Sequence, residues 1–119
     1  MLQFRKFDAL RRRIAVLPIG YADGLHRALS NQIEVLTPYG RAKQVGRICM
    51  DMCMIDVTDL PQVKSGDEVE IFGPHNPVET LAQLAGTIPY ELVCAVSKRV
   101  PRVYFKNGIE IDRELLLRF

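Results

Sequence analysis

Short runs of apolar and β-branched residues, each ended by glycine or proline, constrain this fold more than any other feature of the sequence. Ile14–Leu17 is continuously apolar, and Ile33–Leu36 places a polar residue within an apolar run. Runs of this length and pattern predict short strands rather than long helices. We expect further strands at 42–57 (one or two), 68–72, 103–105 and 109–111. The prediction is a mainly β fold, a small barrel-like domain of about six to seven strands with two short helices.

Two helices are predicted between the later strands. The first spans Glu79–Ala85 with Gly86 as its C-terminal cap, and the second begins near Thr87 and ends before Val100. The pair Asn107-Gly108 then predicts a tight hairpin turn. The inward helix faces are expected to be aliphatic: Leu81, Leu84 and Ala85 in the first helix, and Leu92, Val93 and Val96 in the second.

Composition places the chain among folded globular proteins. Its 119 residues suffice for one domain, so we expect a single domain over 1–119, with 48% apolar and 25% charged residues. A net charge of +2 does not favour a nucleic-acid partner, and the one basic cluster, Arg11–Arg13, is expected to be a solvated face or an interdomain connection. No run reaches the roughly 20 apolar residues that span a bilayer. Residues 1–13 lack a secretion signal, so we expect no membrane partner and a cytoplasmic location.

Residues able to carry chemistry alone are sparse. The sequence contains no phosphate-binding glycine loop, zinc-ligand spacing or Gly-x-Ser-x-Gly segment. His26 and His75 are expected in loops without catalytic roles, and no metal site is expected. The three cysteines, Cys49, Cys53 and Cys94, form no paired framework and are expected to be buried thiols.

The stretch 48–55 is unusual for its three alternating methionines. A strand there would direct Met50, Met52 and Met54 to one side and Asp51 to the other. It would also place Cys49 and Cys53 on a shared face. Met52 and Met54 are therefore expected to fill an irregular core.

Six motifs lie in order along the chain: Ile14–Gly24, Val45–Met52, Val57–Asp59, Gly66–Val69, Thr87–Glu91 and Ser97–Arg102. They resemble the C-terminal domain of bacterial alanine racemase. The resemblance covers about Ile14 to Tyr104, and six motifs in register are far more specific than any one alone.

The resemblance implies a pyridoxal-phosphate enzyme whose catalytic groups lie elsewhere. In that family a lysine of an N-terminal β/α barrel holds the cofactor, and this lysine and a tyrosine act as the two bases. The tyrosine would fall near Leu2, and no tyrosine precedes Tyr21 here. The chain is therefore expected to hold no catalytic residue, to bind no cofactor alone and to be half of an enzyme.

The resemblance does imply a contribution to the substrate site. The backbone N–H of Met50 would bind the carboxylate of L- or D-alanine in the active site of a partner subunit, since family members are head-to-tail dimers. Four residues match the corridor through which substrate enters: Tyr21, Arg27, Arg47 and Val96. The structural alternatives are a half-buried aromatic for Tyr21 and an ion pair with Asp51 or another carboxylate for Arg47.

Two further positions bear on the same site. Asp51 is expected to order its own loop. Lys98 stands where family members often carry a tyrosine near the cofactor phosphate, and an ammonium can contact phosphate as a point charge.

Three functions are compatible with these residues. The preferred one is the C-terminal domain of an alanine racemase, which interconverts L- and D-alanine for cell-wall synthesis. That domain would need a pyridoxal-phosphate barrel on the same or a separate polypeptide, and the present chain would be a truncation or a shortened reading frame. The alternative is a binding or assembly module that docks on a barrel or a polyanion. A small independent enzyme is disfavoured, because no nucleophile and base are positioned together.

Overall fold

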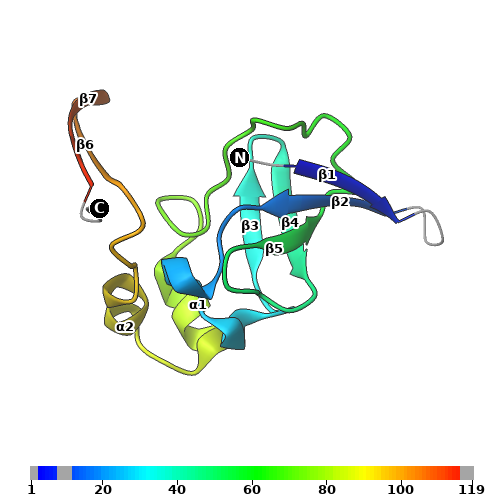
Figure 1. The fold of residues 1–119 in the computed structure, drawn as a ribbon, viewed down its shortest axis with the longest axis horizontal. Coiled ribbons are helices and arrows are strands. Elements are labelled where there is room, and N and C mark those ends of the chain that lie inside the picture. Colours follow the sequence, from blue (N-terminus) through cyan, green and yellow to red (C-terminus); the bar gives the residue numbers. More distant parts are fainter. Residues whose placement is uncertain (1–2, 8–11, 116–119) are drawn as a thin grey trace.

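A five-stranded antiparallel sheet forms the body of the molecule in a computed structural model that describes residues 3–7 and 12–115 (Figure 1). Consecutive strands are not always neighbours, because β5 lies between β2 and β4. The strands, in spatial order, are β1 (Gln3–Phe7), β2 (Arg12–Leu17), β5 (Cys53–Asp56), β4 (Gly40–Val45) and β3 (Glu34–Thr37). Over the described residues the sheet is open, so the mainly β prediction is confirmed without a closed barrel.

The core lies on one face of the three middle strands. Ala15 of β2 is paired with Ile55 of β5, and both are fully buried. Alternation along β5 turns Cys53 and Ile55 inward and leaves Met54 and Asp56 half-buried. The core is completed by aliphatic side chains from the loops and helices, among them Leu25, Leu29, Ile33, Ile48, Val57, Val63, Leu81 and Leu92.

Two short helices follow the sheet strands, as predicted. Helix α1 (Val78–Ala85) ends at Gly86, whose φ of 72° is the left-handed cap expected of glycine. Helix α2 (Pro89–Cys94) has its proline in the first turn and packs against α1 (Figure 1). The predicted inward faces are partly wrong: Leu81 and Leu92 are buried and Val96 is half-buried, whereas Leu84 and Val93 are exposed. In α2 the buried residue is Leu92.

The chain ends its described part in a separate hairpin. Strands β6 (Arg102–Lys106) and β7 (Ile109–Glu114) pair only with each other among the described residues and stand away from the sheet (Figure 1). The predicted Asn107-Gly108 turn is confirmed, with φ of 53° and 78°.

The strand predicted over 68–72 is wrong, whereas the one or two strands predicted over 42–57 are confirmed as β4 and β5. Residues 68–72 make only an isolated bridge, in which Glu70 and Leu36 exchange backbone hydrogen bonds of 2.8 and 3.0 Å. The pairing stops there because the chain turns back between Gly73 and Asn76. A single strand over 48–55 does not form: β5 begins only at Cys53, since the N–H of Cys49 closes a turn onto the carbonyl of Met52 at 2.9 Å.

That turn changes the expected environment of the sulfur-containing residues. Met50 and Met52 are 52% and 51% exposed, so Met52 does not fill the core as expected, while Met54 is half-buried. Of the three thiols predicted to be buried, Cys53 is buried and Cys49 and Cys94 are exposed.

The basic cluster divides between surface and structure. Arg11 lies outside the described residues, and Arg12 pairs with Asp56 at 3.6 Å on the surface. Arg13 instead donates to backbone carbonyls that follow β5, those of Leu60, Pro61 and Val63, so a purely solvated face is wrong for this residue. No helix in the described ranges is long and apolar enough to cross a membrane.

Candidate functional site

Three loops, each within one of the six motifs, meet at one corner of the molecule. The first loop is Gly20–Gly24, the second is Gly46–Met52 and the third is Ser97–Arg102; together we call them the three-loop junction. Backbone hydrogen bonds join the first loop to the other two. The motifs are therefore adjacent in space although they are far apart in sequence.

The first and second loops pack backbone against backbone. The N–H of Tyr21 donates to the carbonyl of Cys49 at 2.9 Å, and the N–H of Ala22 donates to that of Met50 at 3.0 Å. A Cβ on Gly20 would lie 2.1 Å from the Cys49 oxygen and 2.4 Å from the Met50 oxygen. Glycine is required at position 20 because any side chain would force the two loops apart.

Asp23 fixes the first loop and joins it to the third. Its carboxylate accepts the N–H of Gly20 at 2.9 Å, and its carbonyl accepts the N–H of Ser97 at 3.1 Å. Gly24 has a φ of 114°, and a Cβ there would lie 2.5 Å from the carbonyl of Ala95. The Gly-x-x-x-Gly spacing of this motif thus serves two close backbone approaches.

Arg99 of the third loop contacts both other loops. Its Nε lies 3.5 Å from Oδ1 of Asp23, and its Nη2 lies 2.6 Å from Oδ1 of Asp51. The hydrogen bond to Asp51 and the charge of Asp23 raise the pKa of Arg99 above its usual range. Asp51 is paired with Arg99 and not with Arg47, which was the suggested alternative.

The start of the second loop is held by side chains that sequence reasoning missed. Oδ1 of Asn31 accepts the N–H of Gly46 at 2.6 Å, and Oγ of Ser30 accepts the N–H of Ile48 at 2.8 Å. Asn31 has a φ of 63°. A Ser-Asn pair between two elements is a turn signal that could have indicated such anchoring.

Met50 lies at the exposed tip of the second loop. Its carbonyl accepts the N–H of Ala22, whereas its own N–H has no acceptor among the described residues. This N–H sits in a backbone held by hydrogen bonds on the Cys49 and Met50 carbonyls. A fixed and unpaired N–H at a surface is suited to bind a small anion.

The predicted corridor residues are placed unequally around the junction. Tyr21 and Arg47 belong to the first and second loops and are exposed. Val96 directly precedes the third loop and is half-buried. Arg27 is exposed and begins a short 3-10 turn, Arg27–Leu29. Its carbonyl accepts the hydroxyl of Ser30 at 2.7 Å, so Ser30 connects it to Ile48 of the second loop.

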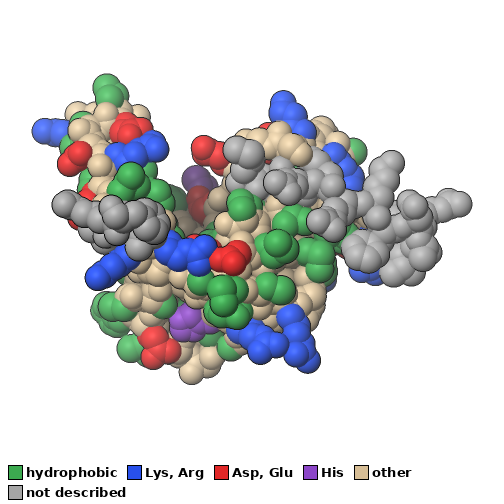
Figure 2. All heavy atoms as spheres, in the orientation of Figure 1, with side chains coloured by type: hydrophobic (Ala, Val, Ile, Leu, Met, Phe, Trp, Pro, Cys, Tyr) green, Lys and Arg blue, Asp and Glu red, His purple; other side chains and the backbone are tan. Residues whose placement is uncertain are grey.

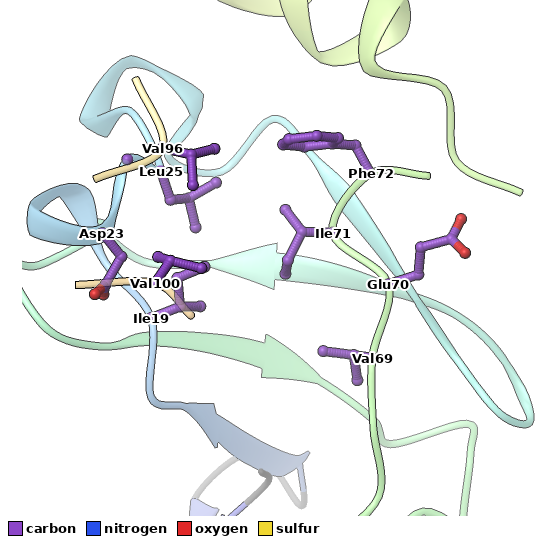
Figure 3. Close-up of a pocket in the computed structure, with 10 residues that line it drawn as sticks. Ile19, Asp23, Leu25, Val69, Glu70, Ile71, Phe72, Val96 and Val100 are labelled. Atoms are coloured by element: carbon purple, nitrogen blue, oxygen red, sulfur yellow. The ribbon is translucent and has the colours of Figure 1, made fainter. Parts of the chain in front are cut away.

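A largely apolar cavity of about 460 Å³ adjoins the junction and shares Asp23, Gly24 and Val100 with it. Aliphatic and aromatic side chains face one another across this cavity, while the carboxyl of Glu70 points away (Figure 3). One wall consists of Ile19, Leu25, Val96 and Val100, and the other of Val69, Ile71 and Phe72.

Lys98, the residue expected near the phosphate of pyridoxal phosphate, is exposed at the third loop, as such a contact would require. The four lysines within 12–115, Lys43, Lys64, Lys98 and Lys106, are all exposed, whereas a lysine that forms an imine usually lies in a desolvated pocket.

The histidines lie apart from the junction's ion pairs, and no metal site accompanies them. His75 is exposed and contacts Glu70 at 3.3 Å within the turn after residue 72. His26 is half-buried and precedes the short 3-10 turn. Residues 3–7 and 12–115 contain no group of three His, Cys, Asp or Glu side chains placed to hold a metal ion.

The fold and the order of these motifs define a class, the C-terminal β domains of amino-acid racemases. The chain belongs to the family described as "Alanine racemase, C-terminal domain", whose model matches residues 5–104. It is 52% identical over 109 residues to alanine racemase 1 of Clostridium acetobutylicum, which covers 87% of this chain and 28% of that protein. It is 56% identical over 92 residues to alanine racemase of Desulfovibrio desulfuricans, covering 76% of this chain and 25% of that protein.

Solved structures of alanine racemases contain the same fold as this chain. Alanine racemase of Clostridium difficile 630 in complex with cycloserine superposes with a TM-score of 0.86 at 34% identity, over 99% of this chain and 34% of that one. Alanine racemase of Bartonella henselae with covalently bound pyridoxal phosphate superposes with a TM-score of 0.79 at 39% identity, over 87% of this chain and 30% of that one. The chain therefore spans about a quarter to a third of the length of these relatives.

Proposed function

We propose that this chain acts as the C-terminal domain of an alanine racemase and supplies the substrate-carboxylate side of a composite active site. The observation that carries the proposal is the Met50 N–H, which is unpaired among the described residues and held in a fixed backbone. The interconversion of L- and D-alanine needs the α-carboxylate held still while the α-proton is exchanged. A backbone donor can do this without adding a charge that titrates.

The surroundings of Met50 support a small, zwitterionic substrate. Arg27 and Arg47 are exposed cations, and they would attract a carboxylate through solution. Tyr21 is bonded through its backbone to the second loop, so its ring would border the path to Met50. Val96 would narrow the same corridor with an apolar side chain.

The cofactor would be contributed mainly by another domain. Pyridoxal phosphate, when bound, supplies an electron sink that stabilises negative charge at the substrate α-carbon. Lys98 is the residue of this chain that would contact its phosphate. We assign no catalytic residue to the chain, and we propose that the isolated domain is inert.

The proposed partners follow from the assignment of the cofactor to another domain and of the substrate carboxylate to this chain. They are a pyridoxal-phosphate barrel domain, a second subunit arranged head-to-tail, and alanine, with no nucleic acid or membrane among them. We place the protein in the cytoplasm, a compartment in keeping with three free cysteines.

Racemisation of alanine tests the proposal directly. The purified chain with added pyridoxal phosphate should be inactive, and the same chain joined to, or mixed with, the barrel domain of a racemase relative should be active. Activity of the chain alone would overturn its proposed inertness. A folded but inactive combination with the barrel would overturn the racemase proposal and favour an assembly module.

Two variants at one position test the role of the Met50 N–H. Met50→Pro removes the N–H, whereas Met50→Leu keeps the N–H and a similar side-chain volume. In the active combination, the proline variant should raise KM for alanine by at least about tenfold, which is the effect of losing a charge-assisted hydrogen bond of about 1.5–3 kcal/mol. The leucine variant should change KM less than about threefold. Equal effects of the two variants would contradict a role for the backbone donor.

A further inference from the structure

Two carboxylates from different loops converge on one guanidinium at the three-loop junction. Arg99 lies 48 residues from Asp51 in sequence, and Nη2 reaches its Oδ1 at 2.6 Å. The Nε edge of the same planar group faces Oδ1 of Asp23 at 3.5 Å. One side chain thus spans the first and second loops.

The two carboxylates depend on Arg99 to different degrees. Asp23 has other ties, because its second oxygen accepts the Gly20 N–H and its carbonyl accepts the Ser97 N–H. The carboxylate of Asp51 has Arg99 as its sole partner in the part of the chain that the structure describes. Removing Arg99 would therefore leave Asp23 in place and release Asp51.

We propose that Arg99 is a positioning residue that fixes the direction of the Met50 N–H by holding Asp51, the next residue, against Asp23. The first loop holds the carbonyls of Cys49 and Met50, and Arg99 holds the chain immediately after them. The tip of the second loop is thus restrained on both sides of the donor. The proposal rests on the proposed function, since it concerns the group that would bind substrate carboxylate.

The contact is suited to positioning rather than to stabilising the fold. The side chains of Arg99 and Asp51 are 42% and 55% exposed, and exposed ion pairs contribute little to the free energy of unfolding. An arginine suits the task because its planar fork can meet two carboxylates, while a lysine ammonium is a single point charge. A loss of loop order should therefore occur without a comparable loss of stability.

Nuclear magnetic resonance of this chain tests the positioning directly. Arg99→Gln should lower the backbone order parameters of Met50 and Asp51 from about 0.85 toward about 0.6, and Arg99→Lys should give intermediate values. The matched control is Arg113→Gln, which removes an exposed arginine paired with Glu110 at 3.1 Å in the hairpin. This control should leave both order parameters unchanged. Unchanged order in Arg99→Gln would overturn the proposal.

A second variant and an activity measurement separate this proposal from the proposed function. Asp51→Asn removes the same ion pair from its other end, keeps Arg99 beside Asp23, and should loosen the same two amides. In the active combination with a barrel, Arg99→Gln should raise KM for alanine about fivefold and change kcat less than about twofold, as expected when binding rather than chemistry is affected. A changed kcat with unchanged KM would overturn the positioning role. If the unsubstituted combination is inactive, the proposed function fails, while the order parameters still decide whether Arg99 restrains Met50.

Discussion

The five-stranded sheet and the β6–β7 hairpin have similar sequence patterns and opposite environments. In β5, Cys53 and Ile55 alternate with half-buried residues and are themselves buried. In β7, Ile109 and Ile111 alternate with charged residues in the same way, yet every residue of the strand is exposed. Figure 2 shows hydrophobic and charged side chains together on the hairpin, and a hollow between it and the rest of the molecule.

The difference teaches that alternation predicts a strand but not what covers it. A strand needs only a partner edge to form its hydrogen bonds, and the hairpin turn brings that edge within a few residues. Burial needs a third element packed on the face, and a lone two-stranded hairpin is marginal in water. The sheet has such elements in the helices and in loop residues such as Leu25 and Leu29, whereas the described residues place none on the hairpin.

Thiol reactivity should show the largest contrast between the buried sheet and the exposed regions. Burial, with the nearby Cys49 thiol, raises the pKa of Cys53 to about 12. At pH 8 the thiolate fraction of Cys53 should therefore be roughly a thousandfold below that of an ordinary thiol with a pKa near 8.5. With Ellman's reagent, Cys49 and Cys94 should react quickly and Cys53 very slowly. Three equally fast thiols would show that the face of β5 is open.

Truncating one isoleucine in each region should reproduce the contrast in stability. Ile55→Ala removes a fully buried side chain and should lower the free energy of unfolding by about 2–5 kcal/mol. Ile111 is 61% exposed, so Ile111→Ala should change it by less than about 0.5 kcal/mol. Urea unfolding measures both. A large effect at Ile111 would mean that the hairpin is covered in solution, for example by a second copy of the chain.

Substitutions of the two neighbouring arginines of β2 should also have unequal effects on the free energy of unfolding. Arg13→Met would leave the carbonyls of Leu60, Pro61 and Val63 without their charged donor. It should lower the free energy of unfolding by about 1.5–3 kcal/mol. Arg12→Met removes an exposed ion pair with Asp56 and should lower the free energy of unfolding much less than Arg13→Met does. Chemical denaturation of both variants is the measurement. Equal losses would mean that the contacts of Arg13 add nothing beyond those of a surface pair.

The smallest expected effect is a loss of stability in acid that comes from Asp56, the last residue of β5. Burial alone would raise the pKa of Asp56, but hydrogen bonds from the Thr58 hydroxyl and N–H, together with Arg12, lower it below its ordinary value. A lowered native pKa means that the stabilisation is present above the unfolded value, near about 4, and is lost as pH falls through the native value. Unfolding measured from pH 6 to pH 3 should show this loss, and Asp56→Asn should flatten it. An unchanged slope in the variant would contradict the assignment.

The parts of the fold that were predictable are those determined by neighbouring residues. The Asn107-Gly108 turn and the Gly86 cap each depend on a few adjacent side chains. Residues 3–7 were not predicted as a strand, because their order comes from pairing with β2. The turn at Cys49–Met52 was missed for a similar reason: it packs on the first loop, and alternating methionines do not reveal that contact.

The candidate site was predictable in its members but not in its connections. The motifs identified the three loops, and Met50 and Asp51 were singled out within the second loop. Arg99 was passed over although it lies inside a quoted motif, because a contact with a residue 48 positions away leaves no local pattern. The anchoring by Ser30 and Asn31 was missed because neither residue belongs to a motif.

The convergence of three distant loops also has a consequence for the order of events in folding. Closing a long loop costs more chain entropy than forming a hairpin such as β3–β4, so contacts between distant residues tend to form late. The tie between Arg99 and Asp51 spans 48 residues, whereas β3 and β4 are joined by a two-residue turn. We therefore expect the Met50 loop to gain its final geometry only after the sheet has formed, so that a folding intermediate with a complete sheet would still lack a competent anion site.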